Sequence, residues 1–388
     1  MGNIYGEAEK IKKEIIELRR WFHAHPEASF EEVKTAGKIR EELDKLYIPW
    51  KKVGNATVAT IKGINGGPVI GLRADMDALE ITEKNEVPYR SLTPGLMHAC
   101  GHDAHMAALL GAAKILINHT GKIGGTIKLI FQPAEEIGRG AQTIVDSGLI
   151  DDVDYFFGIH VRAMQKVGVI EVSDGAIMGG ANSLDITLKG KSGHGGRPHE
   201  TIDTITCGAQ IVQGLQYILS REIPADQSAV ITIGQFHAGT RDNIVAGEAH
   251  LSGTVRVLDD DVRSRIAEAI KRTVDGIALA NRVEATVKCD FATPVLKNSS
   301  NLYQTVLASA LHVTDEDKII PATSSLGTED FSAYSQIAPS FFAFVGSEGE
   351  YPHHHERFDI NEDALPIAAA LHVAFALETV GNANVLAS

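Results

Sequence analysis

The sequence predicts an α/β protein with a mixed, mainly parallel sheet covered by helices on both faces, together with a small inserted domain. Apolar strands alternate with helical stretches in the first and last parts of the chain, as in doubly covered parallel sheets. The middle part has the order β-α-β-β-α-β, which is typical of a ferredoxin-like sandwich. The 388 residues exceed what one core usually supports, so two domains are expected.

The first domain is predicted to open with helices. Apolar residues at helical spacing indicate an amphipathic helix over residues 7–22. The sequence SFEE at 29–32 resembles a capping box that opens a second helix running toward Leu46. The elements expected next are strands at 56–61, 69–73, 126–131 and 155–160, with a buried Ala- and Leu-rich helix at 104–118.

The inserted domain is expected where this pattern changes, near Asn182. Its predicted strands are 183–188, 229–236, 249–257 and 282–291, and its predicted helices are 202–219 and 260–280. Afterwards the first pattern resumes and includes the apolar strand 341–345. We therefore predict that residues 1–182 and 296–388 form one domain, into which residues 183–295 are inserted.

Composition excludes several classes of partner. The formal charge of −14 disfavours nucleic acid and anionic membranes, because both would repel the protein. The first residues are charged, and no uninterrupted apolar run reaches about 18 residues, so neither a signal peptide nor a membrane span is expected. Cys100, Cys207 and Cys289 are too few and too scattered for a disulfide framework, which fits the cytoplasm.

The stretch MHACGHDAH at 97–105 brings a thiol, imidazoles and a carboxylate together around a glycine. Thiolate and neutral imidazole are ligands for zinc and similar divalent ions. Any one of these residues could be buried filler at a helix start. Their combination with Glu135, Glu136, His160 and the histidine triplet at 353–355 instead predicts a hydrolytic metal site.

Four predicted strands lead to ionisable residues at their carboxyl ends, where reactive groups gather in open α/β sheets. These residues are Asp75 and Asp77 after 69–73, Glu135 and Glu136 after 126–131, His160 at the end of 155–160, and His354 after 341–345. Side chains of adjacent extended residues point in different directions, so one glutamate can bind metal while the other holds the attacking water. Asp77 could orient a ligand histidine or cap a helix at Ala78, and His105 could support the site from one helical turn beyond His102.

Several long motifs occur in order along the chain: RRWFHAHPEASFEE, LRADMDAL, MHACGHDAHMAALLG, FQPAEE, GIH, GKSGHGGRPHETID, GTVR, LGTEDFS and HHHERFDI. With these motifs the chain resembles the superfamily of dinuclear-metal aminoacylases and carboxypeptidases. Within it, the chain is similar to the branch of hippurate hydrolases, N-acyl-amino-acid amidohydrolases, N-acetyldiaminopimelate deacetylases and plant auxin-conjugate hydrolases. The resemblance runs from Arg19 to about Leu365.

This resemblance implies a ligand set for two divalent ions, which could be zinc, manganese, cobalt or nickel. The implied ligands are Cys100, His102, Glu136, His160 and His354, and the implied general base is Glu135. Asp75 stands where related branches have a metal-binding histidine. The three consecutive histidines leave the choice of ligand among them open, with His354 favoured.

The resemblance also implies that the inserted domain is a lid through which subunits form a homodimer or a higher oligomer. His194 matches the histidine that reaches the scissile carbonyl, and Asn243 and Arg256 match positions that bind the carboxylate end of the substrate. A guanidinium is suited to this, because it can hold a carboxylate bidentately. His199 either assists His194 or merely packs.

The expected reaction is hydrolysis of the amide bond of an N-acyl amino acid, for example an N-acetyl or benzoyl derivative. Metal-activated water would attack while Glu135 takes and returns the proton, which releases an amino acid and a carboxylic acid. The alternatives are a metallo-dipeptidase or carboxypeptidase of the same superfamily, a thiol hydrolase using Cys100 with His102, and a non-catalytic module that captures amino-acid conjugates. Chelators would inactivate the metal enzymes but not the thiol hydrolase.

Overall fold

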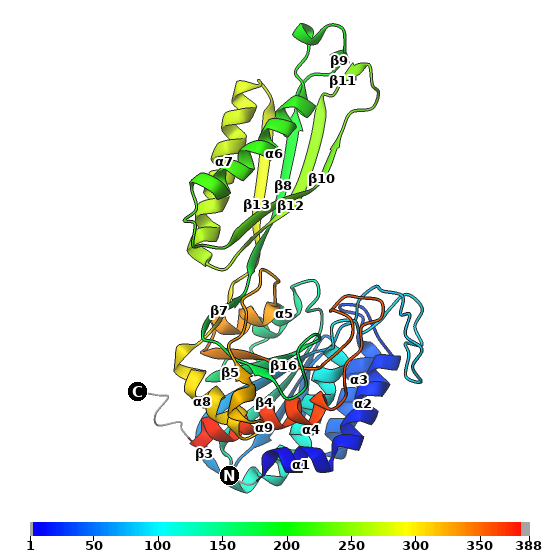
Figure 1. Cartoon of the computed structure of the whole chain (residues 1–388), viewed down its shortest axis with the longest axis vertical. Coiled ribbons are helices and arrows are strands. Elements are labelled where there is room, and N and C mark those ends of the chain that lie inside the picture. Colours follow the sequence, from blue (N-terminus) through cyan, green and yellow to red (C-terminus); the bar gives the residue numbers. More distant parts are fainter. Residues whose placement is uncertain (1–2, 382–388) are drawn as a thin grey trace. The chain divides into compact units, whose positions relative to one another are not determined.

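A computed structural model describes residues 3–381 of the chain, which divide into two compact units. Of these residues, unit 1 comprises 3–175, Lys297–Thr323 and 330–381, and unit 2 comprises Ala176–Leu296 and Ser324–Glu329. Each unit has its own sheet and its own apolar core (Figure 1). The short segment Ser324–Glu329 belongs to unit 2, although the sequence pattern did not single it out.

Unit 1 contains one eight-stranded sheet. Its strands are β1 (Trp50–Val53), β2 (Ala56–Lys62), β3 (Asn65–Asp75), β4 (Gly124–Gln132), β5 (Tyr155–Arg162), β6 (Ile170–Glu171), β15 (Ile319–Ile320) and β16 (Ser340–Gly346). The strand order is β1-β2-β4-β3-β5-β16-β6-β15, and the central strands β4, β3, β5 and β16 run parallel. The predicted mixed, mainly parallel sheet is therefore confirmed.

Helices cover both faces of this sheet, as predicted. They are α1 (Ile4–Lys10), α2 (Lys12–Ala24), α3 (Val33–Lys45), α4 (His102–Asn118), α5 (Gly140–Val145), α8 (Ser300–Leu311) and α9 (Ala364–Gly381), with 3-10 turns at Thr120–Lys122, Glu316–Lys318 and Asp330–Gln336. Successive residues of β5 show the two buried faces. Phe157 stacks on Phe375 of α9, whereas Phe156 stacks on Tyr334 of the turn Asp330–Gln336. Strands buried on both faces read as continuous apolar runs, which is the pattern seen in the sequence.

Helix α9 is apolar all round. By length and composition alone it could cross a membrane, with a mean hydropathy of 1.6, and it is the one such helix among residues 3–381. However, 83% of it is buried inside the protein, where it packs on α4, α8 and the sheet. A helix that is apolar on every side is expected at the centre of such a core.

Unit 2 contains a four-stranded antiparallel sheet of β8 (Gly180–Lys189), β10 (Ala229–Ala238), β12 (Glu248–Val257) and β13 (Glu284–Thr293). Its order is β10-β12-β8-β13, and α6 (Thr204–Arg221) and α7 (Asp260–Ala280) pack on it. The predicted β-α-β-β-α-β order is therefore present. Short elements complete the chain: β7 (Gly175–Met178), β9 (Gly193–His194), β11 (Ile244–Val245), β14 (Leu296–Asn298) and a 3-10 turn at Pro198–Glu200.

Two local predictions were wrong. The helix expected over 7–22 is two helices, because the backbone leaves the helical conformation at Ile11. The expected capping box does not form, since the Ser29 hydroxyl donates instead to the remote carboxylate of Asp77. The free N–H groups at the start of α3 donate to the Glu27 carboxylate, which satisfies them from outside the predicted motif.

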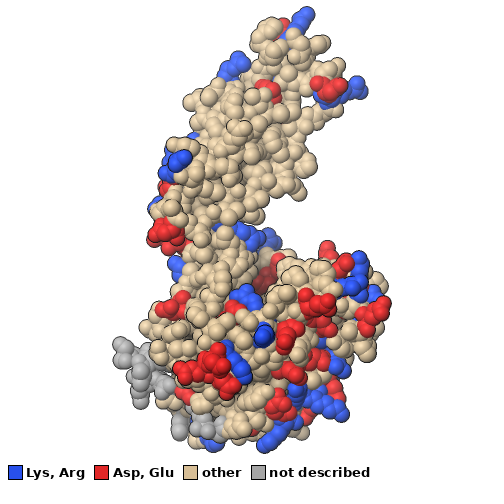
Figure 2. Space-filling view, viewed as in Figure 1, with Lys and Arg blue, Asp and Glu red and all other residues tan. Residues whose placement is uncertain are grey.

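The surface of unit 1 carries charges of both signs. On the face drawn in Figure 2, acidic and basic side chains are intermingled across this unit. That face therefore offers no continuous basic surface of the kind that binds a phosphate backbone.

Candidate metal centre

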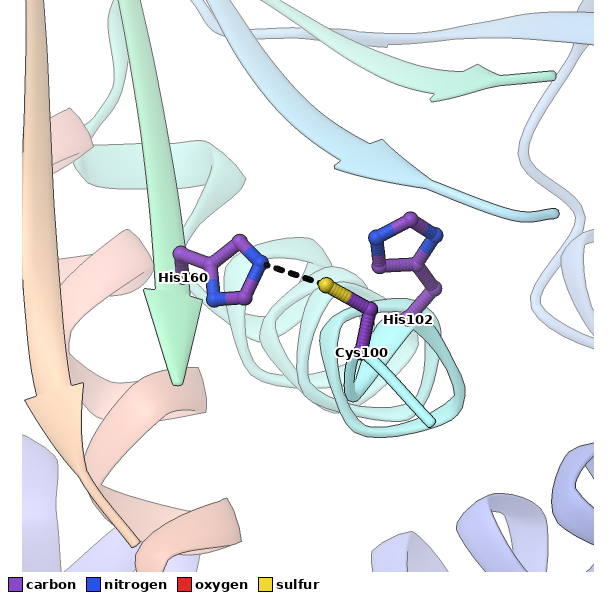
Figure 3. Close-up of side chains that lie close together, drawn as sticks. All are labelled: Cys100, His102 and His160. Atoms are coloured by element: carbon purple, nitrogen blue, oxygen red, sulfur yellow. Dashed lines mark hydrogen bonds between the residues drawn. The ribbon is translucent and has the colours of Figure 1, made fainter. Parts of the chain in front are cut away.

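The first turn of α4 brings two donor side chains to one place. Gly101 precedes the helix with φ +90, and a Cβ atom there would lie 2.3 Å from a methyl group of Val161. Glycine is therefore required for this tight bend between Cys100 and His102. The Cys100 thiol points at His160 at the end of β5, with Sγ and Nε2 separated by 3.5 Å (Figure 3).

A backbone carbonyl group just after the carboxyl end of β3 orients the ring of His102. Its Nδ1 lies 2.9 Å from the carbonyl oxygen of Asp77, so Nδ1 carries a proton and donates it to that oxygen. The other nitrogen, Nε2, is buried without a hydrogen-bond partner. It faces carboxylates of Glu136 at 3.9 Å, Glu135 at 4.0 Å and Asp75 at 3.6 Å.

The two glutamates are held by the carboxylate of Asp77. Its Oδ1 accepts the backbone N–H of Glu135 at 3.0 Å, and its Oδ2 accepts that of Glu136 at 3.1 Å. The preceding Ala134 has φ +56, so the backbone bends sharply there. Asp77 thus anchors the diglutamate turn, and the idea that it caps a helix at Ala78 was wrong, because no helix begins there.

The peptide groups of Val161 organise three histidines. The Val161 carbonyl accepts from His160 Nδ1 at 2.7 Å and from His353 Nε2 at 3.0 Å. The Val161 N–H donates to His105 Nε2 at 2.9 Å, which leaves the proton of His105 on Nδ1, where it bonds Asp75 at 2.6 Å. His105 therefore has both nitrogens occupied and supports the centre, while His160 presents a bare Nε2 toward Cys100.

The histidine triplet sends one ring to this cluster. His354 has φ +64, its N–H donates to the Ala99 carbonyl at 2.8 Å, and its Nε2 lies 3.6 Å from Glu136 Oε2. His353 is engaged with Val161, and His355 Nδ1 accepts the N–H of Arg357 at 3.1 Å. The geometry therefore favours His354 among the three.

The donors fall into overlapping groups whose ligand atoms all lie within 4.8 Å of one another. The groups at the centre are Cys100–His102–His160, Cys100–Glu136–His354, His102–Glu135–Glu136 and Asp75–His102–His105. Two donor atoms in them, His102 Nε2 and Glu136 Oε1, are buried and lack hydrogen bonds. Buried polar atoms are normally satisfied, so this donor set fits divalent cations.

The electrostatics agree with a site built for positive charge. Burial and the nearby Glu136 carboxylate raise the pKa of the Cys100 thiol well above its ordinary value. Burial opposes charge on His102, yet Asp75 and Asp77 raise the pKa of His102 well above its usual range.

A buried arginine beneath the centre was missed from the sequence. Arg73 on β3 donates to Asp75 at 2.7 Å, to Gln132 at 2.9 Å and to Asp330 at 3.1 Å. Asp75 is therefore shared between Arg73 and His105. The available signal was the charged pair inside the otherwise apolar strand LRAD, since charges are buried only when paired.

The remaining predicted residues belong to unit 2. His194 on β9 and Asn243 next to β11 are exposed, and the N–H of Gly195 donates to the Asn243 carbonyl at 2.9 Å. Arg256 on β12 is half-buried and donates to the carbonyl of Leu326 at 3.0 Å. His199 has a side chain 76% exposed, 3.8 Å from Glu200.

Comparisons with known proteins extend this description. The family model described as peptidase family M20/M25/M40 matches residues 71–378. An N-acetylcysteine deacetylase of Bacillus subtilis is 37% identical, covering 94% of this chain and 97% of the relative. Thermostable carboxypeptidase 2 of Saccharolobus solfataricus is also 37% identical, covering 96% and 97%. The solved structure of a B. subtilis protein described as a dinuclear metal binding peptidase from the M20 family is 34% identical, with a TM-score of 0.87 over 96% of this chain and 99% of that one.

Proposed function

The chain belongs to peptidase family M20/M25/M40, and from that premise we propose that it is a metal-dependent amidohydrolase acting on N-acyl amino acids. The observation that carries the proposal is the convergence of the five donors of unit 1 around buried, unpartnered atoms of His102 and Glu136. The relative that is an N-acetylcysteine deacetylase supports this class of substrate.

We propose that these residues would hold two divalent ions, with Cys100 belonging to both donor groups. His102 and His160 complete one donor group, and Glu136 and His354 complete the other. The dinuclear relative supports this number. When bound, a divalent ion here supplies the Lewis acidity that makes water nucleophilic near neutral pH. Thiolate and imidazole donors accept zinc, cobalt, nickel or manganese, and metal analysis of the purified protein decides among them.

Glu135 is proposed as the general base. Its backbone is fixed by Asp77, and its carboxylate lies in the cluster beside His102 with a side chain 11% exposed. Glu135 takes a proton from the attacking water as the carbon–oxygen bond forms at the acyl carbon. It then gives this proton to the amide nitrogen as the carbon–nitrogen bond breaks, so the products are an amino acid and a carboxylic acid.

Unit 2 is proposed to bind the substrate as a lid. His194 would donate to the carbonyl oxygen of the scissile amide, while Asn243 and Arg256 would hold the carboxylate of the amino-acid part. His199, in the 3-10 turn that follows β9, would support it. We further propose a cytoplasmic homodimer or higher homo-oligomer formed through unit 2, whose edge strand β10 leaves one side unpaired in its sheet.

A carboxypeptidase or dipeptidase is the second candidate, favoured by the thermostable carboxypeptidase among the relatives. The test is to compare turnover of metal-replete protein on N-acetyl amino acids and on dipeptides with the same C-terminal residue, detecting released amine. We expect faster turnover of the N-acetyl substrates, and loss of activity after chelation. Faster turnover of the dipeptides would support the second candidate. Activity that survives chelation but not thiol alkylation would overturn both.

A further inference from the structure

We infer that Arg19 of α2 is a positioning residue for the metal centre, because it links the helix start that carries His102 to the loop that carries His354. The inference rests on the proposed metal-binding roles of those two histidines. Arg19 lies in the motif RRWFHAHPE, for which the sequence suggested no role in the chemistry.

The contacts of Arg19 define this link. Its side chain is 0% exposed, Nε donates to Asp103 Oδ2 at 2.7 Å, and Nη2 donates to Asp359 Oδ1 at 2.6 Å. Asp103 directly follows His102 in the first turn of α4, and Asp359 follows the turn that contains His354. A guanidinium is a rigid planar fork, so it fixes the two carboxylates relative to each other.

Both carboxylates are also held from a second side. His23, one turn beyond Arg19, places Nδ1 2.8 Å from Asp103 Oδ2 and Nε2 3.1 Å from Glu83. The Tyr89 hydroxyl donates to Asp359 Oδ2 at 2.8 Å, and the Arg19 guanidinium lies 5.0 Å from the Tyr89 ring centre. Asp359 is thus held through both of its oxygens, whereas Asp103 accepts Arg19 and His23 at the one oxygen Oδ2 and its buried Oδ1 has no hydrogen-bond partner. Shared partners of this kind restrict both carboxylates, which gives the link the stiffness that positioning requires.

The position of His354 depends on contacts elsewhere in its loop, because its own side chain is little enclosed and its backbone conformation is unusual. Its side chain is 54% exposed and its backbone adopts φ +64, a conformation that non-glycine residues rarely take. The bond from its N–H to Ala99 ties the loop to the segment before α4, and further bonds tie it to Val161, Lys84 and Asn85. The Arg19–Asp359 ion pair connects the same loop to α2, and Arg19 also holds Asp103, next to His102. The distance between His354 and His102 is therefore maintained through Arg19.

The neighbouring Arg20 provides a matched control. It lies on the same helix, shares Glu362 with Arg19 and lies 4.8 Å from the Tyr89 ring centre. Its guanidinium donates to the Glu362 carboxylate rather than to Asp103 or Asp359. Lysine keeps the charge at either position but cannot reproduce the fork. Arg20→Lys, at a side chain 47% exposed, therefore removes a guanidinium from the same helix without touching the link.

The test is competition for Zn²⁺ between the full-length protein and a chelator of known affinity, for the wild type, Arg19→Lys and Arg20→Lys. We expect Zn²⁺ affinity to fall about 10- to 100-fold in Arg19→Lys, which is typical for the loss of a residue that orients a ligand. Arg20→Lys should bind Zn²⁺ as the wild type does. Asp359→Asn is a milder change at a partly exposed residue, and it replaces Arg19→Lys in the test if that variant fails to fold. We expect it to weaken binding of the ion near His354 more than binding of the second ion.

Unchanged Zn²⁺ affinity in folded Arg19→Lys, or in Asp359→Asn, would overturn the inference and leave a purely structural ion pair. Such a result would not affect the proposed function, which has its own control. If Cys100→Ser and the wild type bind Zn²⁺ equally, the metal site itself is misplaced, and the proposed function fails instead.

Discussion

Units 1 and 2 differ in where they place ionisable side chains. Unit 1 buries many of them at and around the donor cluster, where Arg19, Arg73 and His102 are fully buried. In unit 2, His194 and Asn243 are exposed and Arg256 is half-buried, above a conventional apolar core of α6, α7 and one sheet face. Burying charge costs free energy unless each charge is paired, so the buried charges of unit 1 mark chemistry that its fold must accommodate. The exposed side chains of His194 and Asn243 in unit 2 are not singled out by burial in this way.

The largest expected effect sharpens this comparison in unit 1. Glu135→Gln removes the proposed base but keeps the shape of the side chain and its backbone bond to Asp77. We expect kcat to fall about 10²- to 10⁴-fold, because proton transfer is lost, while two metal ions stay bound. Steady-state kinetics and metal analysis on the same sample measure both quantities. Wild-type turnover in the metal-replete variant would remove Glu135 from the mechanism.

A smaller effect is expected from unit 2. His194→Ala should lower kcat about 10²- to 10³-fold, as for other donors that stabilise an oxyanion, without changing metal affinity. His199→Ala, in the 3-10 turn that follows β9, is the comparison variant and should lose much less. If His194→Ala is as active as the wild type, His194 does not stabilise the oxyanion, and the proposed role of unit 2 is reduced to binding the substrate.

The smallest effect on turnover is expected from the core of unit 2. Leu251 on β12 is fully buried, so Leu251→Ala should lower the free energy of unfolding by about 2–5 kcal/mol. Because the donor cluster lies in unit 1, Zn²⁺ affinity should not change. Denaturant unfolding and chelator competition check the two statements, and a parallel loss of Zn²⁺ affinity would show that the units are energetically coupled.

The sequence predicted the fold wherever a long pattern was repeated. Five strands of unit 1, namely β2, β3, β4, β5 and β16, and helix α7 were found within a few residues, because their apolar patterns are long. The short strands β1, β6 and β15 were not predicted. Local motifs were less informative. The break at Ile11 interrupts an otherwise continuous helical pattern, and Ser29 and Glu27 choose partners that only the tertiary structure brings near.

For the site, the donor residues could be predicted from the sequence, but the groups that hold them in position could not. Strand ends pointed to His160, the glutamate pair and His354, and the structure gathers them with Cys100. The central role of Val161 was invisible because it acts through its peptide groups rather than its side chain. The pairing of Arg19 with Asp103 and Asp359 was equally hidden, since nothing in the sequence relates such distant positions.

The most direct test of the central claim is anomalous X-ray scattering from crystals of the protein grown with Zn²⁺. We predict two peaks in unit 1, one at Cys100, His102 and His160 and one at Cys100, Glu136 and His354, with zinc about 2.3 Å from the Cys100 sulfur. Peaks remote from Cys100, or none in crystals grown with excess Zn²⁺, would contradict the claim.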